Sequence, residues 1–240
     1  GGALCERIGW RNTFFSFSAA AILVSIIFFL AAKEPARETR AGRAAGKIGW
    51  SRPVIIFLCL AAAVFTFREF SGWGGYYILP IFLESYHRFS VRTAGLISGL
   101  QSVGGLFAQP LGGYFSDRVG RRRLMSVLLF FVFLIVIAMP FCGRSMIVPL
   151  VLLYSVAYTA TVPIIDAMIA DRTPPAIRGG VFGLFMAAGI GISAFSPLAQ
   201  AGILDATGAS FRGFVTCFSL LGTTALISFV ILLMFKDAGK

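Results

Sequence analysis

Residues 113–141, GYFSDRVGRRRLMSVLLFFVFLIVIAMPF, join an arginine-rich turn to a long apolar run. Residues 124–141 contain no charged side chain, and Ser126 is their one polar residue. The hydrocarbon core of a bilayer is about 30 Å thick, so a spanning helix needs about 20 mostly apolar residues. The stretch therefore predicts a membrane-spanning helix that begins at a basic membrane surface.

Composition extends this prediction to the whole chain. Its 240 residues are 58% hydrophobic and 13% charged, whereas about a quarter of the residues in a soluble domain are charged. Residues 213–235 form a second run without charge. We expect an all-α, multi-pass integral membrane protein with spans at roughly 13–32, 54–80, 93–115, 123–142, 146–170, 179–203 and 212–235.

The amino-acid composition also disfavours several classes of function. The net charge of +11 does not indicate a nucleic-acid partner, because the basic residues sit in short clusters between apolar runs. One histidine and four scattered cysteines cannot build a metal centre or a nucleophile constellation. We therefore expect no metal, no cofactor and no enzymatic activity.

Arginine and lysine also predict the orientation in the membrane. The segment 33–52, the cluster at 118–123 and the C-terminal lysines fall on one side of the predicted spans, and fewer basic residues fall on the other. Cytoplasmic loops carry the excess of Lys and Arg. The segment 33–52 and the C-terminus are thus predicted to be cytoplasmic, in an inner or plasma membrane.

A short string recurs within the chain. Pro-Leu followed by Asp and Gly occurs at 110–120 and again at 197–208. One copy ends its predicted helix on the cytoplasmic side and the other on the outer side. This favours two three-helix units of inverted topology, as in many secondary transporters. Chance similarity of Gly, Pro and Asp strings is the alternative.

The turn at 113–122, GYFSDRVGRR, resembles the loop signature Gly-x-Leu-Ala-Asp-Arg-x-Gly-Arg-Arg of the major facilitator superfamily, which has a related copy between its eighth and ninth helices. Phe115 and Ser116 depart slightly from that pattern. The resemblance implies that Asp117 is a gate residue. It also implies supporting roles for Gly113, Arg118, Gly120, Arg121 and Arg122. The alternative is a plain basic turn without a gating role.

Two further stretches resemble the same family. PPAIRG at 174–179 is similar to the turn that opens its eleventh helix, which adds Arg178 and Gly179 to the gating motif. GWRNTF at 9–14 is similar to the opening of its sixth helix. The resemblance therefore implies helices six to twelve: a last N-terminal-half helix (1–32), a cytoplasmic linker (33–52), a six-helix C-terminal bundle of two inverted three-helix repeats (53–236) and a tail (237–240). The N-terminal half would be a missing partner.

The second predicted span carries charge near mid-membrane. Arg68 and Glu69 cost energy there unless they face a water-filled cavity or a partner. Adjacent residues point about 100° apart on a helix, so we do not expect them to pair with each other. Three glycines between Ser71 and Tyr77 predict a discontinuous helix that presents Tyr76 and Tyr77 to a binding site. A structural ion pair with another helix is the alternative.

Other polar residues are weaker candidates. Gln101, like Gln109 and Gln200, could face the same cavity. Asp166 could line the cytoplasmic half-channel or pair with Arg172 or Arg178. His87 is expected to be solvated in an outer loop, with pH sensing as the alternative.

Small residues recur at fourfold spacing on two predicted helices, and such faces mark close helix contacts in lipid. The resemblance implies that both faces slide against the opposite half during gating, and static packing inside one bundle is the alternative. The two series are Gly104, Ala108 and Gly112, and Gly179, Gly183, Ala187 and Gly191.

The predicted function is secondary active transport by alternating access. The sequence has no Gly-x-x-x-x-Gly-Lys-Ser/Thr loop for ATP. We expect Glu69 to take part in proton coupling and Arg68 to attract an anionic substrate group. A symporter or antiporter fits, either for efflux of drugs or metabolites or for uptake of small organic anions. The partners are then the lipid bilayer, a small solute and the proton. The alternative is a truncated, non-transporting membrane protein that acts as a packing partner.

Overall fold

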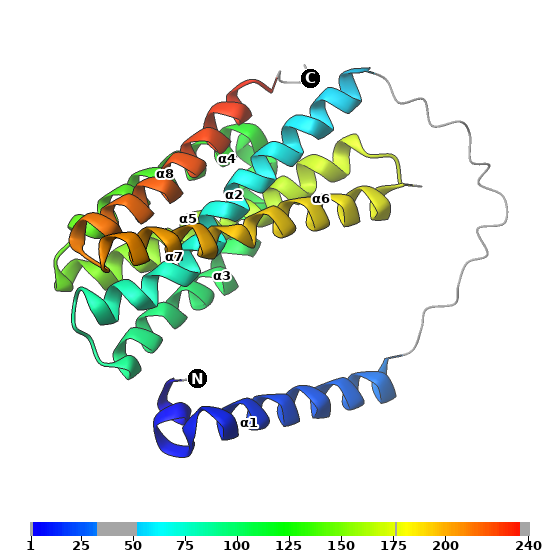
Figure 1. The fold of residues 1–240 in the computed structure, drawn as a ribbon. Helices are drawn as coiled ribbons and strands as arrows, with labels where there is room; N and C mark the ends of the chain where they lie inside the picture. Colours follow the sequence, from blue (N-terminus) through cyan, green and yellow to red (C-terminus); the bar gives the residue numbers. More distant parts are fainter. Residues whose placement is uncertain (1, 33–51, 176, 236–240) are drawn as a thin grey trace. The chain divides into compact units, whose positions relative to one another are not determined.

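The computed structural model describes residues 2–32, 52–175 and 177–235 (Figure 1), and every regular element among them is a helix. The chain divides into two compact units, Gly1–Gly49 and Trp50–Lys240. The predicted linker, apart from Arg52, and the predicted tail lie outside the described residues. Each unit is therefore considered by itself.

The first unit contains one long helical element, α1 (Gly2–Ala31). Gly9 interrupts it with φ 77° and ψ 160°, so a new helix begins inside the GWRNTF stretch. The part Arg7–Ala31 is long and apolar enough to cross a membrane. Within this unit its apolar side chains are uncovered; Phe29, for example, is 83% exposed. Such a helix needs lipid or further helices around it.

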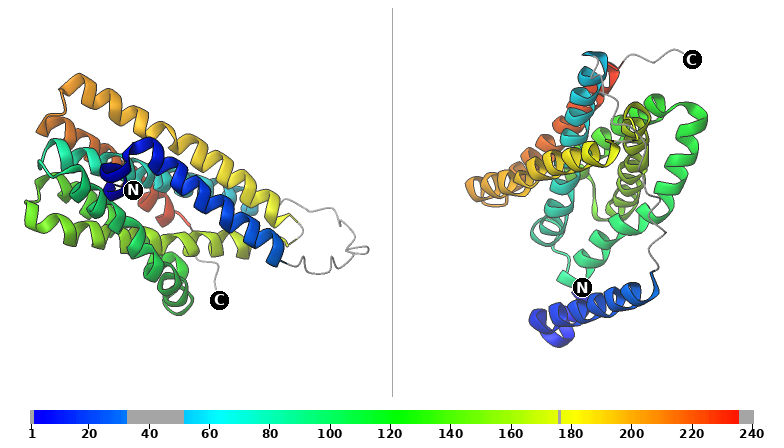
Figure 2. Two further views of the ribbon diagram at one scale, coloured as in Figure 1. Left: turned by 90° about the horizontal axis from the view of Figure 1, so that it is seen from below. Right: turned by 90° about the vertical axis from the view of Figure 1, so that its right-hand side faces the viewer.

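The second unit is a helical bundle. Its elements are α2 (Arg52–Ser85), α3 (Val91–Val119), α4 (Arg121–Ala138), the short 3-10 helix η1 (Met139–Phe141), α5 (Arg144–Arg172), α6 (Arg178–Ser193), α7 (Phe195–Thr207) and α8 (Phe211–Leu233). Figure 2 shows α6 and α7 continuing almost in line, and together they form one candidate span, Arg178–Thr207. Helix α3 covers the predicted span 93–115 but is less apolar than the other spans, because Gly, Ser and Gln replace aliphatic residues along it.

The helices of the two predicted three-helix units pack in corresponding pairs. Helix α3 packs along α5 as α6 and α7 pack along α2, while α8 packs on α2 as α4 packs on α5. Gly120 closes α3 with φ 102°, and Gly208 closes α7 with φ 66°. Both are conformations that glycine adopts without steric cost. The two copies of the recurrent string thus end corresponding helices, as the inverted repeat predicts.

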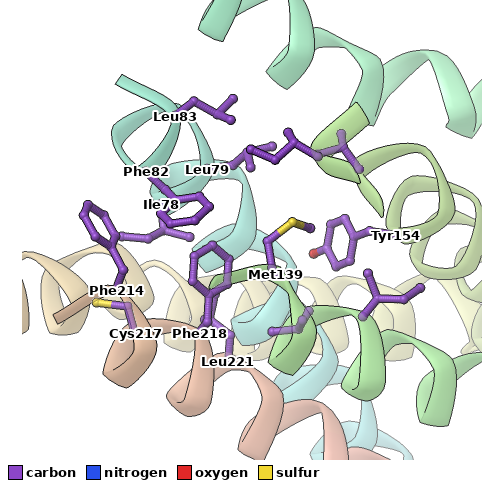
Figure 3. Close-up of a cluster of buried hydrophobic side chains, with 14 of the residues drawn as sticks. Ile78, Leu79, Phe82, Leu83, Met139, Tyr154, Phe214, Cys217, Phe218 and Leu221 are labelled. Carbon is purple, nitrogen blue, oxygen red and sulfur yellow. The ribbon is translucent and has the colours of Figure 1, made fainter. Parts of the chain in front are cut away.

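The bundle has two apolar core clusters with a polar layer between them. One cluster centres on Phe82, Phe214 and Phe218 (Figure 3). The Phe82 ring meets each of the other two edge to face, with 5.2 Å between ring centroids. The other lies near Phe65 and Met125. Buried polar side chains occupy the levels in between: Arg68, Ser71, Thr159, Thr161, Ser193, Ser196, Gln200 and Ser228. A polar layer at mid-bundle is unusual in lipid and marks the region of functional interest.

The prediction of a discontinuous second helix is wrong. Helix α2 runs unbroken from Arg52 to Ser85. Its glycines serve close packing instead, since a Cβ at Gly72 would overlap the phenol of Tyr158, and a Cβ at Gly75 would lie 2.7 Å from the Tyr154 hydroxyl oxygen. Intrahelical hydrogen bonds in lipid stabilise the helix strongly enough to tolerate such glycines.

The packing of α3 on α5 can be tested at Gly112, where the two backbones lie close together. A Cβ at Gly112 would lie 2.5 Å from the carbonyl oxygen and 3.0 Å from the Cα of Ala160, and backbone cannot move aside cheaply. We expect Gly112→Ala to destabilise the full-length protein by about 1–3 kcal/mol in thermal unfolding in detergent. Gly202→Ala is the control, because an added Cβ there would meet no atom of the described part of the chain within 4 Å. Equal unfolding temperatures of the two variants would contradict the α3–α5 contact.

Candidate functional site

Arg68 is the centre of the polar layer. Its side chain projects from α2 toward α5 and is 2% exposed. The guanidinium donates from Nε to the Thr161 hydroxyl at 2.5 Å and from one terminal nitrogen to the Tyr158 carbonyl at 3.2 Å. Its carbon also lies 4.2 Å from the centroid of the Tyr158 ring. A buried guanidinium needs such partners, because an unpaired charge in a low-dielectric interior is very costly.

Glu69 completes the coordination of Arg68, which corrects the expectation that these neighbours do not pair. The other terminal nitrogen of Arg68 forms an ion pair with Glu69 Oε1. The Tyr158 hydroxyl donates to Glu69 Oε2 at 3.4 Å. Both side chains are long enough to converge beside the helix although their Cβ atoms diverge. Among the described residues, the alternative of an ion pair with another helix is also not found: α5 supplies Tyr158 and Thr161, which carry no charge.

A cavity of about 390 Å³ opens beside this pair. The residues that line it come from α2, α3, α5 and α6: Phe65, Arg68, Glu69, Trp73, Tyr76, Gln109, Tyr158, Thr159, Val162, Asp166, Met186 and Ile190. Trp73 is 48% exposed and Tyr76 37% exposed on this side of the unit. The arrangement provides an aromatic surface around a few convergent polar groups, which is typical of small-molecule sites.

Asp166 lies in this cavity wall. The prediction that it pairs with Arg172 or Arg178 is wrong, because Arg172 lies over the ring of Phe57 at 4.8 Å and Arg178 donates to backbone carbonyls. Asp166 Oδ1 is enclosed and has no hydrogen-bond partner among the described residues. An enclosed carboxylate oxygen without a partner is costly, so this side chain is a candidate to bind a ligand.

The remaining predicted site residues divide between the cavity and the interior. Gln109 lines the cavity, whereas the Gln101 side chain is 1% exposed and lines a smaller interior pocket with Tyr154. The carbonyl of Gln101 accepts from Tyr76 at 3.4 Å, which anchors α2 to α3. Tyr77 does not line the cavity; it is 38% exposed on another face of α2.

The predicted gating motif forms a second polar cluster where α3 ends. Arg121 donates to Asp117 Oδ1 at 3.1 Å, pairs with Asp171 Oδ2, and donates to the Ala167 carbonyl at 2.9 Å. It thus fastens the α3–α4 turn to the end of α5. Asp117 keeps 65% of its side chain exposed, so it remains accessible to a further partner.

Other arginines of the gating motif make contacts at the same end of the bundle. Arg122 donates to the Leu233 carbonyl at the end of α8, and Arg178 donates to Ala170 and Thr173 carbonyls at the end of α5. Arg118 lies over the Tyr114 ring at 4.2 Å. Cations that bind terminal carbonyls stabilise helix C-termini. Gly120, with φ 102°, allows the turn, whereas Gly113 lies inside α3, and a Cβ at Gly179 would meet no described atom within 4 Å.

The two small-residue series have different environments. Gly104, Ala108 and Gly112 pack against α5, so static packing describes that face. On α6, Gly179, Gly183 and Gly191 have no neighbouring atom within 4 Å among the described residues. Static packing within this bundle is therefore the wrong interpretation for α6, whose small face is open.

His87 is packed, not solvated as expected. Its ring meets Phe82 at 4.7 Å and Tyr86 at 5.0 Å, both edge to face. Burial and the nearby Arg144 guanidinium lower the pKa of His87 below its usual value. Since the neutral form is favoured in the folded state, any contribution of His87 to stability is lost as the pH falls below its ordinary pKa of about 6.5.

Sequence reasoning missed several residues that hold the site. Tyr158 and Thr161 bind Arg68, Trp73 and Met186 line the cavity, and Asp171 binds Arg121. One signal was present: residues 154–161, YSVAYTAT, place hydroxyls on nearly every face of a predicted span. Such a density of polar groups in lipid needs partners.

Comparisons with known proteins agree with this architecture. The family model described as "Major Facilitator Superfamily" matches residues 66–240. No curated protein matches the chain in sequence. The peptide transporter POT (E310Q mutant, in complex with sulfate) is similar in structure, with a TM-score of 0.64 and 17% identity, over 73% of this chain and 37% of that chain.

A bacterial homologue of the human lysosomal transporter Spinster is also similar. Its inward-facing, occupied conformation has a TM-score of 0.56 and 20% identity, over 94% of this chain and 56% of that chain. Its inward-facing, unoccupied conformation has a TM-score of 0.56 and 19% identity, over 94% of this chain and 57% of that chain. Likeness at these identities shows the fold, and the chain spans little more than half the length of these structures, or less.

The Arg68–Glu69 pair can be tested by a double-mutant cycle. Arg68→Met leaves the Glu69 carboxylate without a cation, and breaking a buried pair costs about 3–5 kcal/mol. We expect Arg68→Met to lower the unfolding midpoint of the full-length protein and Arg68→Met/Glu69→Leu to recover part of the loss. Arg92→Met, at an exposed cation, is the control. Strictly additive effects would show that the two side chains are not coupled.

Proposed function

Because this chain belongs to the major facilitator superfamily, we propose that it forms part of a secondary active transporter that moves a small solute by alternating access. The observation that supports this most is the cavity beside Arg68, Glu69 and Asp166 at the level of the polar layer. A protein that served only as a packing partner would gain nothing from charged residues there, since each is costly in lipid.

A second helical bundle completes the site in this proposal. Trp73, Met186 and the open small-residue face of α6 are exposed within the second unit. Small residues let backbones approach closely, and that contact supplies association energy in lipid. The predicted N-terminal half is the natural occupant. Movement between the two halves would open the cavity to one side of the membrane and then to the other.

Asp117 would take part in that movement. Arg121 holds its turn on α5, yet most of the Asp117 side chain stays exposed. A carboxylate fixed in this way is suited to bind the N-terminus of a helix from the opposite half, where the helix dipole favours negative charge. Breaking that contact would accompany opening of this end of the protein.

The orientation proposed is cytoplasmic for the end that carries Asp117. The described residues of this end include Arg118, Arg121, Arg122 and Arg123, and cytoplasmic loops are the more basic. The linker and the C-terminus lie on the same side in this proposal. A single cysteine at position 123 should then react with an impermeant maleimide in inside-out vesicles and not in intact cells.

Proton coupling would act through Glu69. When this carboxylate is ionised, it neutralises Arg68. When it gains a proton, the ion pair is lost and Arg68 needs another acceptor, for which Asp166 on the same cavity wall is suitably placed. Proton binding would thus change the charges that a solute meets, which is the basis for either symport or antiport.

Transport by the full-length protein in vesicles tests this role. We expect Glu69→Gln to abolish transport driven by a pH gradient while solute exchange without a gradient persists, because glutamine cannot exchange a proton. Glu84→Gln is the matched control, since Glu84 is also on α2 but does not line the cavity. Unchanged dependence on the pH gradient in Glu69→Gln would rule out the coupling role.

A further inference from the structure

The guanidinium of Arg68 is buried and mostly engaged by protein partners. Nε, both terminal nitrogens and one face of the group are engaged by Thr161, Tyr158 and Glu69. With 2% of the residue exposed, the two remaining N–H groups are poorly accessible, and an incoming anion that approached the guanidinium closely would have to displace one of these partners. Displacement would leave a carboxylate or a hydroxyl without its bond, and each such loss is costly in a buried site.

The two carboxylates in the cavity wall are the available charges. Glu69 keeps 13% of its side chain exposed and is bound on one side by Arg68. Asp166 has no ion pair and no hydrogen bond among the described residues. Of the described cavity residues, Arg68 is the one cation and Glu69 and Asp166 are the anions, so with both carboxylates ionised the wall carries a net negative charge.

The apolar part of the wall is suited to a cation as well. Trp73, Tyr76, Phe65 and Tyr158 surround the carboxylates, and Met186 closes the α6 side. Aromatic faces attract cations, tryptophan most strongly, and the attraction grows as water is excluded. Trp73 is 48% exposed, so its ring is free to receive a ligand.

From this combination we propose that the site binds an organic cation with an aromatic or otherwise apolar body, such as an aryl-ammonium compound. The positive group would lie at Asp166, and the apolar body would lie against Trp73 and Met186. The inference rests on the proposed transport function for its biological setting, but it concerns recognition alone. It replaces the expectation that Arg68 selects anions, because that guanidinium is buried and already paired with Glu69.

Binding of two ions of similar size and opposite charge tests the proposal. Phenyltrimethylammonium and benzenesulfonate would be titrated into the purified full-length protein in detergent, with the heat of binding as the readout. We expect the cation to bind at least about tenfold more tightly, equivalent to about 1.4 kcal/mol. Tighter binding of benzenesulfonate, or no binding of the cation, would overturn the proposal.

Variants locate the interaction. Asp166→Asn should weaken binding of the cation about tenfold or more, whereas Asp166→Glu should keep much of the affinity. The single variant Trp73→Leu should also weaken binding of the cation. Asp205→Asn is the matched control, because Asp205 is an exposed carboxylate outside the cavity. An affinity for the cation that is unchanged in Asp166→Asn would contradict the assignment.

Transport assays separate this inference from the proposed function. If the cation binds through Asp166 but vesicles bearing the full-length protein never move it, the transport proposal fails and the recognition proposal stands. If the vesicles move benzenesulfonate and its binding does not change in Asp166→Asn, the recognition proposal fails and transport stands.

Discussion

The need to satisfy a buried arginine in the middle of a membrane bundle organises the centre of this structure. Arg68 is placed by α2 where a charge is costly, and Glu69, Tyr158 and Thr161 together supply its partners. Those partners must come close, so Gly72 leaves room for the Tyr158 phenol. The apolar clusters on either side then seal the polar layer from the ends of the bundle.

Much of this fold follows from local sequence. Apolar runs of membrane-spanning length predicted the helices, and the recurrent string at 110–120 and 197–208 marked two helix ends, where Gly120 and Gly208 have the positive φ that glycine readily adopts. Basic residues and the 113–122 motif predicted the family, which the match over 66–240 shows. These features depend on residues close together in the chain, which is why they could be predicted without the structure.

The site depended on tertiary contacts that no local pattern contains. The glycines after Ser71 looked like a break in α2 because their packing against α5 is invisible in the sequence. Asp166 looked like a surface ion-pair residue because Arg172 and Arg178 follow it closely, yet both arginines have other partners. The same fourfold spacing of small residues gave a buried face on α3 and an open one on α6, which shows that spacing identifies a contact surface but not its partner.

The central claim is that the wall formed by Glu69, Asp166 and Trp73 borders water and not lipid. Accessibility of single cysteines to an impermeant maleimide, in a full-length protein freed of other reactive cysteines, tests it directly. Val162→Cys, in the cavity wall, should be labelled from at least one side of the membrane, whereas Ile165→Cys (fully buried) and Phe131→Cys (on the outer face of α4) should stay unlabelled. A Val162→Cys variant as inert as Phe131→Cys would contradict the account.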